Sequence, residues 1–225
     1  MIVQEPPYDL IALFSDAEMK SLLESLIERG QVGRNCTRPF RWRSLCDPRR
    51  DTVWREPDRP LSLFLKMNCS FLIVWDHQGS GREDRDPAEV EAEAVRNLTL
   101  AGVPAERVHA VALNPEVEIA WRPVWSKVKQ LVADERRAEP PSDDAILAEA
   151  RRAKPRLRIP DEFEEALSRF PKEIFEALVR LLRLRRSPPL YAKLGQTVSI
   201  RTLKREAALA RIAEAISTWL PPIPV

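Results

Sequence analysis

The most continuous hydrophobic stretches of the chain are three short runs in its first half. They are YDLIALF (residues 8–14), FLIVW (71–75) and VHAVAL (108–113). Apolar runs of this length, without strict alternation of polar positions, are typical of strands that are buried on both faces. We therefore expect these runs to form the centre of a mainly parallel sheet that is covered by helices.

The stretches between the runs have the periodicity of amphipathic helices. Residues 15–18 (SDAE) have the pattern of a capping box, in which Ser15 and Glu18 begin a helix that ends near Arg29. A second helix is expected after Pro87 and a third from about Pro123. The alternation of strands and helices predicts an α/β fold built from βαβ units.

The remaining segments are less regular. Residues 32–60 show no clear periodicity, and we expect a strand and long loops there. Residues 138–144 (AEPPSDD) have the composition of a linker, and the pattern beyond them is helical. We therefore divide the chain into an α/β domain (1–137) and a helical C-terminal module (138–225). Helices of this module are expected at 144–152, 161–170, 171–186 and 201–220, with a loop at 187–189.

The composition is that of an ordinary soluble globular protein. Hydrophobic residues make up 44% of the 225 residues, which is enough for a sizeable core. No apolar run approaches the roughly 20 residues that cross a bilayer, and the N-terminus lacks a signal-peptide pattern. The three cysteines form no CxxC pair, which argues against a disulfide framework or a structural zinc site. These features favour a reduced, cytoplasmic setting without a membrane partner.

Charge is unevenly distributed along the chain, although the formal net charge is only +2. Residues 151–225 contain 16 Lys and Arg against 8 Asp and Glu, whereas residues 1–150 contain 20 against 26. A basic part beside an acidic part suggests either an anionic partner such as nucleic acid, or attraction between the two parts. The sequence leaves both explanations open.

Asp76 ends the second apolar run and is followed directly by the glycine-rich loop HQGSG. In open α/β sheets, ligands bind beyond the carboxyl ends of the strands, and glycines let the backbone approach a bound group. Asp76 is therefore a candidate ligand for a divalent cation that positions a phosphate. The alternative is that Asp76 caps its own loop by accepting hydrogen bonds from loop amides.

Further acidic residues follow the other two runs. Glu116 and Glu118 lie two residues apart in NPEVEIAW, so in an extended segment both side chains point the same way. Together with Asp76 they would supply carboxylates at two strand ends, as a Mg²⁺ site requires. Asp16 and Glu18 follow the first run, but helix capping and the helix dipole also explain these two residues.

The helical tail carries a basic run that consists of Arg180, Arg183, Arg185 and Arg186. Cations are favourable at the C-terminus of a helix, which is one explanation of the run. The other is binding to phosphates, for which Arg183, Arg185, Arg186 and Lys193 are the candidates in contact with a nucleic-acid backbone. The sequence has neither GxxxxGK[ST] nor GxGxxG, so the usual loops for nucleoside triphosphates and dinucleotides are absent.

Four segments spread over most of the chain carry short motifs: YDLIALFSDAEM, FLIVWDHQGSG, NPEVEIAW and RRSPPLYAKL. Together with Lys154-Pro155, they resemble an uncharacterised bacterial family with a TOPRIM-like core. Members of this family occur in prokaryotic anti-phage defence loci, including methylation-associated defence islands. The resemblance therefore implies a component of a defence system that works with other defence proteins.

The same resemblance implies a set of site residues. TOPRIM-like sites hold Mg²⁺ for phosphodiester chemistry with a glutamate after the first strand and acids after later strands. In this chain the corresponding residues are Glu18 (or Asp16), Asp76 and Glu118.

Two functional hypotheses follow. The first is a Mg²⁺-dependent, nuclease-like enzyme in which Asp76, Glu118 and Glu18 are the catalytic carboxylates. The second is a non-catalytic interaction subunit that keeps the fold and docks onto larger defence proteins. Gln78 takes the place of a second acid and Asn114 replaces an aspartate, and either departure is compatible with a weakened or lost catalytic site. The departure at Gln78 favours the second hypothesis, whereas the acids that follow three strands favour the first.

Overall fold

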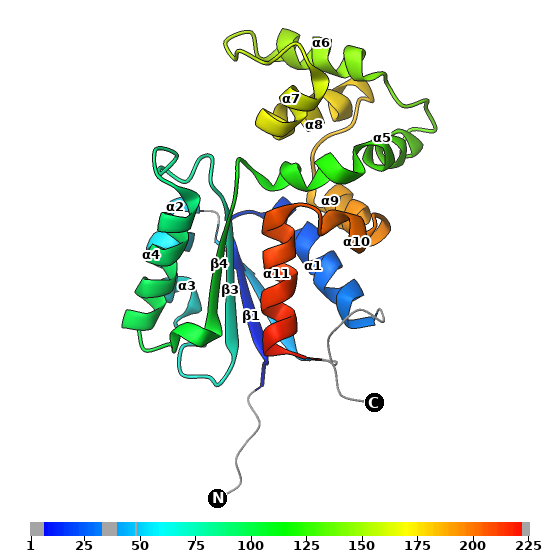
Figure 1. Cartoon of the computed structure of the whole chain (residues 1–225). Coiled ribbons are helices and arrows are strands. Elements are labelled where there is room, and N and C mark those ends of the chain that lie inside the picture. Colours follow the sequence, from blue (N-terminus) through cyan, green and yellow to red (C-terminus); the bar gives the residue numbers. More distant parts are fainter. Residues whose placement is uncertain (1–6, 33–39, 48, 222–225) are drawn as a thin grey trace, which may run out of the picture.

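Four parallel strands form one sheet with the spatial order β2-β1-β3-β4 (Figure 1). The computed structural model describes residues 7–32, 40–47 and 49–221. The three apolar runs form three neighbouring strands, which confirms the predicted α/β fold with a parallel sheet flanked by helices. The strands are β1 (Leu10–Phe14), β2 (Trp42–Cys46), β3 (Ser70–Asp76) and β4 (Val108–Leu113).

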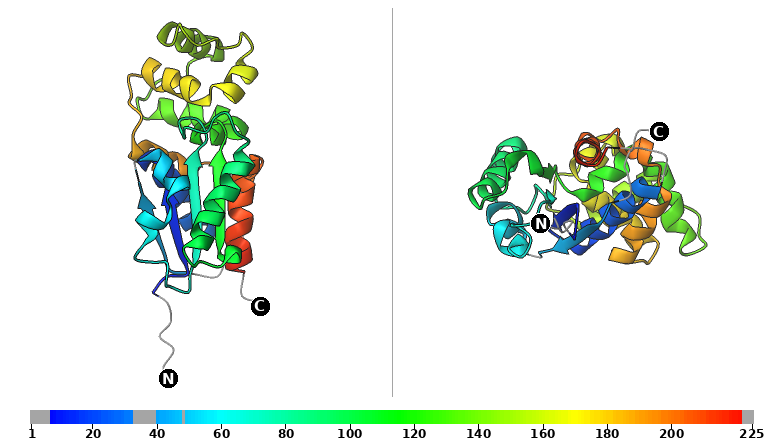
Figure 2. Two further views of the ribbon diagram at one scale, coloured as in Figure 1. Left: turned by 90° about the vertical axis from the view of Figure 1, so that its left-hand side faces the viewer. Right: turned by 90° about the horizontal axis from the view of Figure 1, so that it is seen from below.

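Side chains of β1, β3 and β4 alternate between two hydrophobic cores, one on each face of the sheet. Phe14 and Val74 belong to the core that includes α1 (Ala17–Val32), whereas Ile73 and Trp75 belong to the core on the opposite face. That second core is covered by α2 (Arg50–Arg55), α3 (Asp58–Leu61) and α4 (Pro87–Leu100). Figure 2 shows helices on both faces. Because both faces are covered, the inner strands are apolar throughout.

The chain leaves β1 and β3 in opposite directions. From β1 it passes through α1 to β2, and from β3 it passes through α4 to β4, with the two helices on opposite faces. The carboxyl ends of β1 and β3 therefore border a topological switch point, which is where ligands bind in open α/β sheets. Asp76 lies at one of these ends, and Asp16 and Glu18 follow the other.

The outer edge of β4 is closed by side chains. Glu91 of α4 accepts a hydrogen bond from the amide of Ala112 (2.8 Å). Arg211 of α11 (Ala207–Trp219) donates to the carbonyl of Ala110 (3.4 Å) and to Glu91 (2.5 Å). Backbone groups of an edge strand that could otherwise pair with another chain are thus occupied.

The chain beyond β4 is helical, and α9 to α11 return to the sheet. The helix α9 packs along α1, and α11 packs against β4. The predicted division at residue 137 stays a prediction. We call α6 to α8, which project beyond the carboxyl edge of the sheet (Figure 1), the helical lobe. The helical segments around and beyond β4 are η1 (Ala105–Arg107), η2 (Val117–Val124), α5 (Trp125–Asp134), α6 (Asp143–Ala153), α7 (Phe163–Arg169), α8 (Pro171–Leu181), α9 (Pro188–Thr197), α10 (Ile200–Leu203) and α11.

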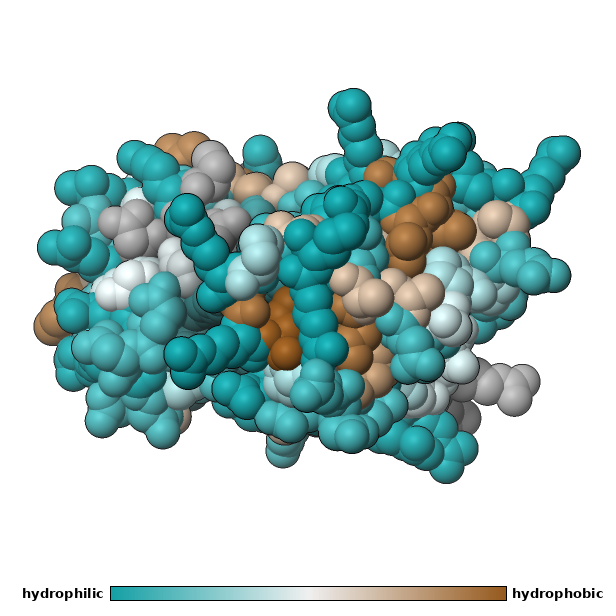
Figure 3. Space-filling view, turned by 90° about the horizontal axis from the view of Figure 1, so that it is seen from above, coloured by the Kyte–Doolittle hydropathy of each residue, from teal (hydrophilic) through white to brown (hydrophobic). Residues whose placement is uncertain are grey.

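Seen from the side of the helical lobe, the surface is mostly hydrophilic, with smaller hydrophobic areas between charged side chains (Figure 3). Large exposed apolar side chains come from four separate segments: Leu63, Leu100, Leu157 and Leu181. Among the described residues, no helix is both long and apolar enough to cross a membrane.

The predicted helix over 171–186 begins at Pro171 as expected but ends earlier, and the predicted loop over 187–189 was wrong. The helix α8 ends at Leu181, and α9 begins at Pro188. Proline fits the first turn of a helix because that turn has no use for its missing amide. The two prolines therefore begin a helix here. The predicted helix over 201–220 is divided into α10 and α11.

Two predictions for the first third of the chain also need correction. The capping box was wrong: Asp16 accepts the hydrogen bond from the amide of Met19 (2.7 Å), while the Ser15 hydroxyl donates to the Met19 sulfur. The region expected to hold a strand and long loops does contain β2, but it also contains α2 and α3. Residues 33–39 and 48 of that region lie outside the described part.

Candidate functional site at the carboxyl edge of the sheet

Acidic side chains from three segments gather at the carboxyl edge of the sheet. Asp76 ends β3, Glu116 and Glu118 follow β4, and Glu18 lies in the first turn of α1. The strands β3 and β4 are parallel neighbours in which Asp76 pairs with Leu113, so Asp76 and Glu118 lie at the same edge, as predicted. Asp76, Glu116 and Glu118 are all at most 5% exposed. Buried carboxylates require partners, and these decide what the site can do.

Glu118 is held by Arg186, from the connection between α8 and α9, and by Tyr191 of α9. The Tyr191 hydroxyl donates a hydrogen bond to Glu118 Oε1 (2.5 Å), and Arg186 Nη2 lies 2.9 Å from the same oxygen. Arg186 also forms ion pairs with Glu18 (3.5 Å) and with Glu176 of α8 (3.2 Å). The Arg186 guanidinium therefore lies between acids that come from α1, from the end of β4 and from the helical lobe.

Glu116 has a different cationic partner. Its Oε1 atom accepts a hydrogen bond from Lys172 Nζ of α8 (2.6 Å), while its Oε2 atom is buried and has no hydrogen-bond partner in the described part of the chain. The expectation of an extended segment was wrong for Glu118. The chain is extended at Glu116, but Val117 begins the 3₁₀ helix η2. The two glutamates therefore reach different partners.

Asp76 is bound to the segment that follows β4. Its Oδ1 atom accepts a hydrogen bond from the amide of Val117 (2.8 Å), the first residue of η2. This hydrogen bond is not the predicted cap of the loop that follows Asp76. It fixes the start of η2, and so it fixes the position of Glu118 one residue later.

The glycine-rich loop after Asp76 uses its own carboxylate. Gly79 (φ 83°) and Gly81 (φ 76°) both have the left-handed backbone conformation that favours glycine. Both of their amides donate to Glu83 Oε1, at 2.6 and 3.2 Å. The carboxylate of Glu83 thus takes the position next to these two amides that a bound anion would take.

Burial raises the pKa values of the acids at this edge. The pKa of Asp76 is raised well above its usual value by burial and then by repulsion from Glu118, Asp16 and Glu116, against the hydrogen bond from Val117. Burial raises the pKa of Glu118 to about 7, although Arg186 and Tyr191 oppose the increase. Burial also raises the pKa of Glu116, and Lys172 opposes it. Negative charge at this edge is therefore unfavourable unless a cation neutralises it.

The basic partners keep their charge. Burial lowers the pKa of Arg186, but Glu118 and other neighbours raise it more, so the net shift is upward. Burial likewise lowers the pKa of Lys172, and Glu116 more than restores it. Burial and the Glu118 charge raise the pKa of Tyr191, which keeps its hydroxyl proton available for donation.

Close packing of α9 on α1 positions Tyr191 over the edge. A Cβ atom at Gly195 would lie 2.9 Å from the Leu22 carbonyl oxygen, so only glycine allows this approach. Arg29 of α1 donates hydrogen bonds from Nη1 to the carbonyls of Gly195 (2.6 Å) and Val198 (2.7 Å) at the end of α9. The helix that carries Tyr191 is thus fixed to the helix that carries Glu18.

The four predicted nucleic-acid contacts lie in different surroundings. Arg186 belongs to the buried cluster, and Lys193 forms an ion pair with Glu135. Arg183 and Arg185 are exposed beyond the end of α8, with Arg183 in the left-handed conformation (φ 53°). Two of the four residues are therefore free to meet a phosphate backbone, and nucleic-acid binding stays a prediction.

The predicted Mg²⁺ ligands do not fit that ion as they are arranged. Glu18 and Glu118 are both paired with Arg186, and Asp16 caps α1. Mg²⁺ binds in an octahedral set of oxygens, including one or two carboxylates whose charge is available to it. In the described ranges, no three His, Cys, Asp or Glu side chains form a group that could hold a metal. A Mg²⁺ site stays a prediction that requires Arg186 to move.

Sequence reasoning missed three members of this cluster: Lys172, Glu176 and Tyr191. Attraction between the two parts of the chain was one of two explanations of the basic surplus of residues 151–225, and the surplus could not identify the pairs. The segment RRSPPLYAKL contains both Arg186 and Tyr191, and it was the strongest signal in the tail.

Comparisons of the chain with protein-family models, with curated proteins and with solved structures find no match.

Proposed function

We propose that the chain is a non-catalytic binding subunit of a prokaryotic anti-phage defence system. The observation that carries the non-catalytic role is the position of Arg186, which is ion-paired with Glu118 at 2.9 Å and with Glu18 at 3.5 Å. A cation that belongs to the chain neutralises the edge where a TOPRIM-like enzyme would hold Mg²⁺. The defence role is supported by the four motif segments.

In this proposal the acids at the edge fasten the C-terminal helices to the sheet. Glu116 binds Lys172 of α8, and Glu118 binds Tyr191 of α9. Breaking a buried ion pair by removing one partner costs about 3–5 kcal/mol, so such pairs resist separation of the parts that they join. The sheet and the helical lobe therefore offer partner proteins a fixed, mostly hydrophilic surface (Figure 3).

A second candidate function is Mg²⁺-dependent, nuclease-like chemistry. It is favoured by the burial of Asp76 and Glu118 together at the edge of the sheet, where burial and then the Glu118 charge raise the pKa of Asp76. Clusters with such perturbed pKa values are enriched at functional sites. The enzyme hypothesis requires Arg186 to leave the cluster, with Arg183 and Arg185 available for the nucleic-acid backbone.

The substitution Asp76→Asn separates the two candidates. Asparagine keeps the oxygen that accepts from the Val117 amide but removes the charge that a hard cation requires. For a binding subunit we expect phage protection to persist and the melting temperature to stay the same or rise, since a buried charge is removed. The matched control is Asp84→Asn, which changes an exposed aspartate in the nearby loop.

Loss of protection in Asp76→Asn, with folding intact and Asp84→Asn normal, would favour the enzyme. Titration of the purified proteins with Mg²⁺ then completes the test. The subunit proposal is overturned if the wild-type chain binds Mg²⁺ and cleaves phage nucleic acid, and if Asp76→Asn loses both properties.

A further inference from the structure

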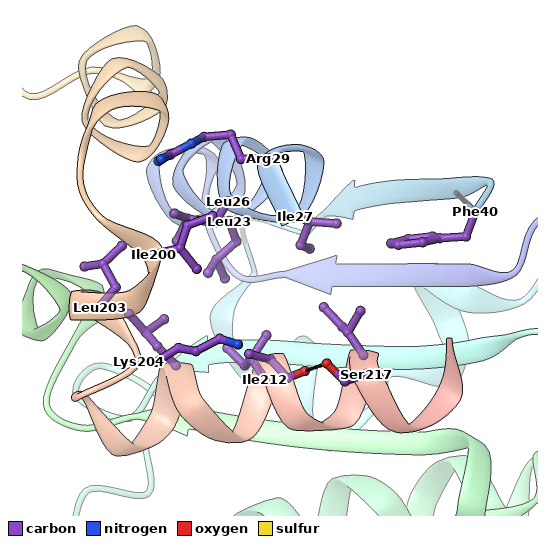
Figure 4. Close-up of a pocket in the computed structure, with 13 residues that line it drawn as sticks. Leu23, Leu26, Ile27, Arg29, Phe40, Ile200, Leu203, Lys204, Ile212 and Ser217 are labelled. Atoms are coloured by element: carbon purple, nitrogen blue, oxygen red, sulfur yellow. Dashed lines mark hydrogen bonds between the residues drawn. The ribbon is translucent and has the colours of Figure 1, made fainter. Parts of the chain in front are cut away.

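A cavity of about 100 Å³ lies between α1, α10 and α11, away from the carboxyl edge (Figure 4). Its wall is mainly aliphatic, with contributions from Leu23, Ile27, Leu203, Ile212 and Ile216. Each of these side chains is at most 8% exposed. Other lining residues, among them Leu26, Ile200 and Ser217, are half-buried, so the cavity is a partly open hollow whose floor belongs to the hydrophobic core.

Two cationic side chains also line the cavity. Lys204 is exposed, and in the described ranges of the chain its ammonium group has no carboxylate partner. In Figure 4 its side chain extends along the wall toward Ile212. The hydrogen bonds of Arg29 go to the carbonyls of Gly195 and Val198, so its charge is not matched by a described carboxylate either.

The polar capacity of the wall is otherwise small. The Ser217 hydroxyl, which also lines the cavity, donates to the Ala213 carbonyl (2.8 Å) and is thus already used. A polar ligand such as a sugar or a nucleobase would leave its own polar groups without partners in this hollow, which is unfavourable. A ligand that fits this cavity therefore has an apolar group that contacts the wall and a negative charge that lies next to the cations.

The size of the cavity limits the apolar group. An engineered closed apolar cavity of about 150 Å³ binds benzene, so this cavity of about 100 Å³ encloses part of a short aliphatic tail, and its open side leaves room for the remainder. An apolar cavity that stays empty destabilises a fold, because its lining loses contacts. A ligand that fills it would restore those contacts and stabilise the folded state by mass action.

We propose that this cavity binds a small anionic amphiphile, namely a carboxylate with an unbranched or branched aliphatic tail of roughly four to six carbons. The tail lies among the aliphatic side chains, and the carboxylate pairs with the ammonium group of Lys204. The proposal is independent of the binding-subunit function, since the cavity shares no described ion pair with the carboxyl edge.

The test uses the full chain and three six-carbon probes: hexanoate, hexanol and hexylamine. Saturable binding is followed by the methyl resonances of the protein in NMR titrations and by the melting temperature. Hexanoate is expected to bind with one-to-one stoichiometry, whereas hexanol binds about tenfold more weakly because it lacks the charge that Lys204 meets. Hexylamine, with the opposite charge, is expected not to bind.

Three variants locate the site. Lys204→Gln should weaken hexanoate about tenfold and leave hexanol unchanged. Ala213→Leu, which places a larger side chain in the cavity wall, should abolish binding of both probes. The matched control is Arg201→Gln, which removes an exposed cation from the same helix but does not line the cavity, and it should bind hexanoate as the wild type does.

Several outcomes overturn the proposal. One is the absence of saturable hexanoate binding up to about 10 mM, which is weaker than any specific site needs. Another is equal binding of hexanoate and hexanol with no effect of Lys204→Gln, which would rule out the anionic class. Unchanged binding in a folded Ala213→Leu protein would place the ligand elsewhere; if that variant does not fold, Ser217→Leu takes its place.

Discussion

The carboxyl edge of the sheet and the cavity between α1, α10 and α11 differ in the sign of their charged side chains and in whether those side chains have partners. At the edge, carboxylates are buried and each finds a donor in the same chain, above all Arg186, Tyr191 and Lys172. At the cavity, Lys204 and Arg29 lie beside an apolar hollow without a described carboxylate. The acids at the edge are held by cations and donors of the same chain, whereas the positive charge at the cavity has no described counterpart.

From this difference we expect a ligand at the cavity rather than at the strand ends. Strand ends are the usual position for binding in open α/β sheets, and the acids at this edge follow that rule in sequence. Each of these acids, however, already has a donor or a cation of the same chain as its partner. A cation without a described carboxylate partner, Lys204, instead lines the cavity between α1, α10 and α11. No sequence motif indicates a site there.

The substitution Arg186→Met has the largest expected effect, because it removes the cation that is paired with buried Glu118. We expect it to destabilise the fold by about 3–5 kcal/mol at pH 8, because Glu118 would remain buried without its cation. Urea unfolding followed by circular dichroism measures the change. The exposed neighbour Arg185, changed to Met in the same way, should alter stability by less than about 0.5 kcal/mol. Equal effects of the two variants would contradict the buried role of Arg186.

The pH dependence of stability tests the same cluster. The pKa of Glu118 is about 7 in the folded chain against a usual value of 4.5, so the folded state binds more protons between these values. Stability should therefore fall as the pH rises from about 4.5 to about 7, by up to about 3 kcal/mol from this group. Urea unfolding at a series of pH values checks this slope.

The variant Glu118→Gln should flatten that slope, because it removes the titrating group. Glu164→Gln is the control, since it changes an exposed glutamate and should keep the slope of the wild type. A steep slope that survives in Glu118→Gln would mean that other groups dominate the titration.

The contribution of Tyr191 should be smaller. Tyr191→Phe removes the hydroxyl that donates to Glu118, and a hydrogen bond to a charged group contributes about 1.5–3 kcal/mol. Chemical denaturation gives the value, and Tyr8→Phe, whose ring is half-buried at the start of the described chain, serves as the control. A loss no greater than that of the control would show that the hydroxyl does not support the buried acid.

At the cavity we expect a substitution that increases the stability of the fold. Ala213→Leu adds apolar volume to the wall of the hollow, and filling a cavity typically stabilises a fold by about 0.5–2 kcal/mol. Ala207→Leu, at an exposed position of the same helix, should have almost no effect. Destabilisation by Ala213→Leu, measured by thermal and urea unfolding, would mean that the space is not available to an added side chain.

Much of the fold could be predicted because a buried strand appears in the sequence as a continuous run of apolar residues. The runs at β1, β3 and β4 are apolar on both faces, and this alone identified them as buried strands, although β4 lies at an edge of the sheet rather than at its centre. The edge strand β2 mixes Trp42 and Leu45 with Arg43, so its pattern is weaker. The start of α9 was missed because Pro188 and Pro189 are as typical of a first helical turn as of a loop.

The site could be predicted only in part. Asp76 and Glu118 were identified because each follows a buried strand, and strand ends of a parallel sheet meet at one edge. The partners were not, because Glu118 and Arg186 are 68 positions apart and their meeting depends on how α8 and α9 pack. The uneven charge was compatible with attraction between the two parts of the chain as well as with an anionic partner, and it carries no information on which side chains pair.

The side chains that close the outer edge of β4 also limit how the sheet can polymerise. A growing β-fibre needs an open edge on each molecule that it adds and another on the far side for the next. Here Glu91 and Arg211 already hold Ala112 and Ala110, so an incoming strand would first have to displace a salt bridge. Two copies that paired through their β2 strands would present only blocked β4 edges to the solvent. Strand pairing would then end at a dimer, and fibre growth would stop.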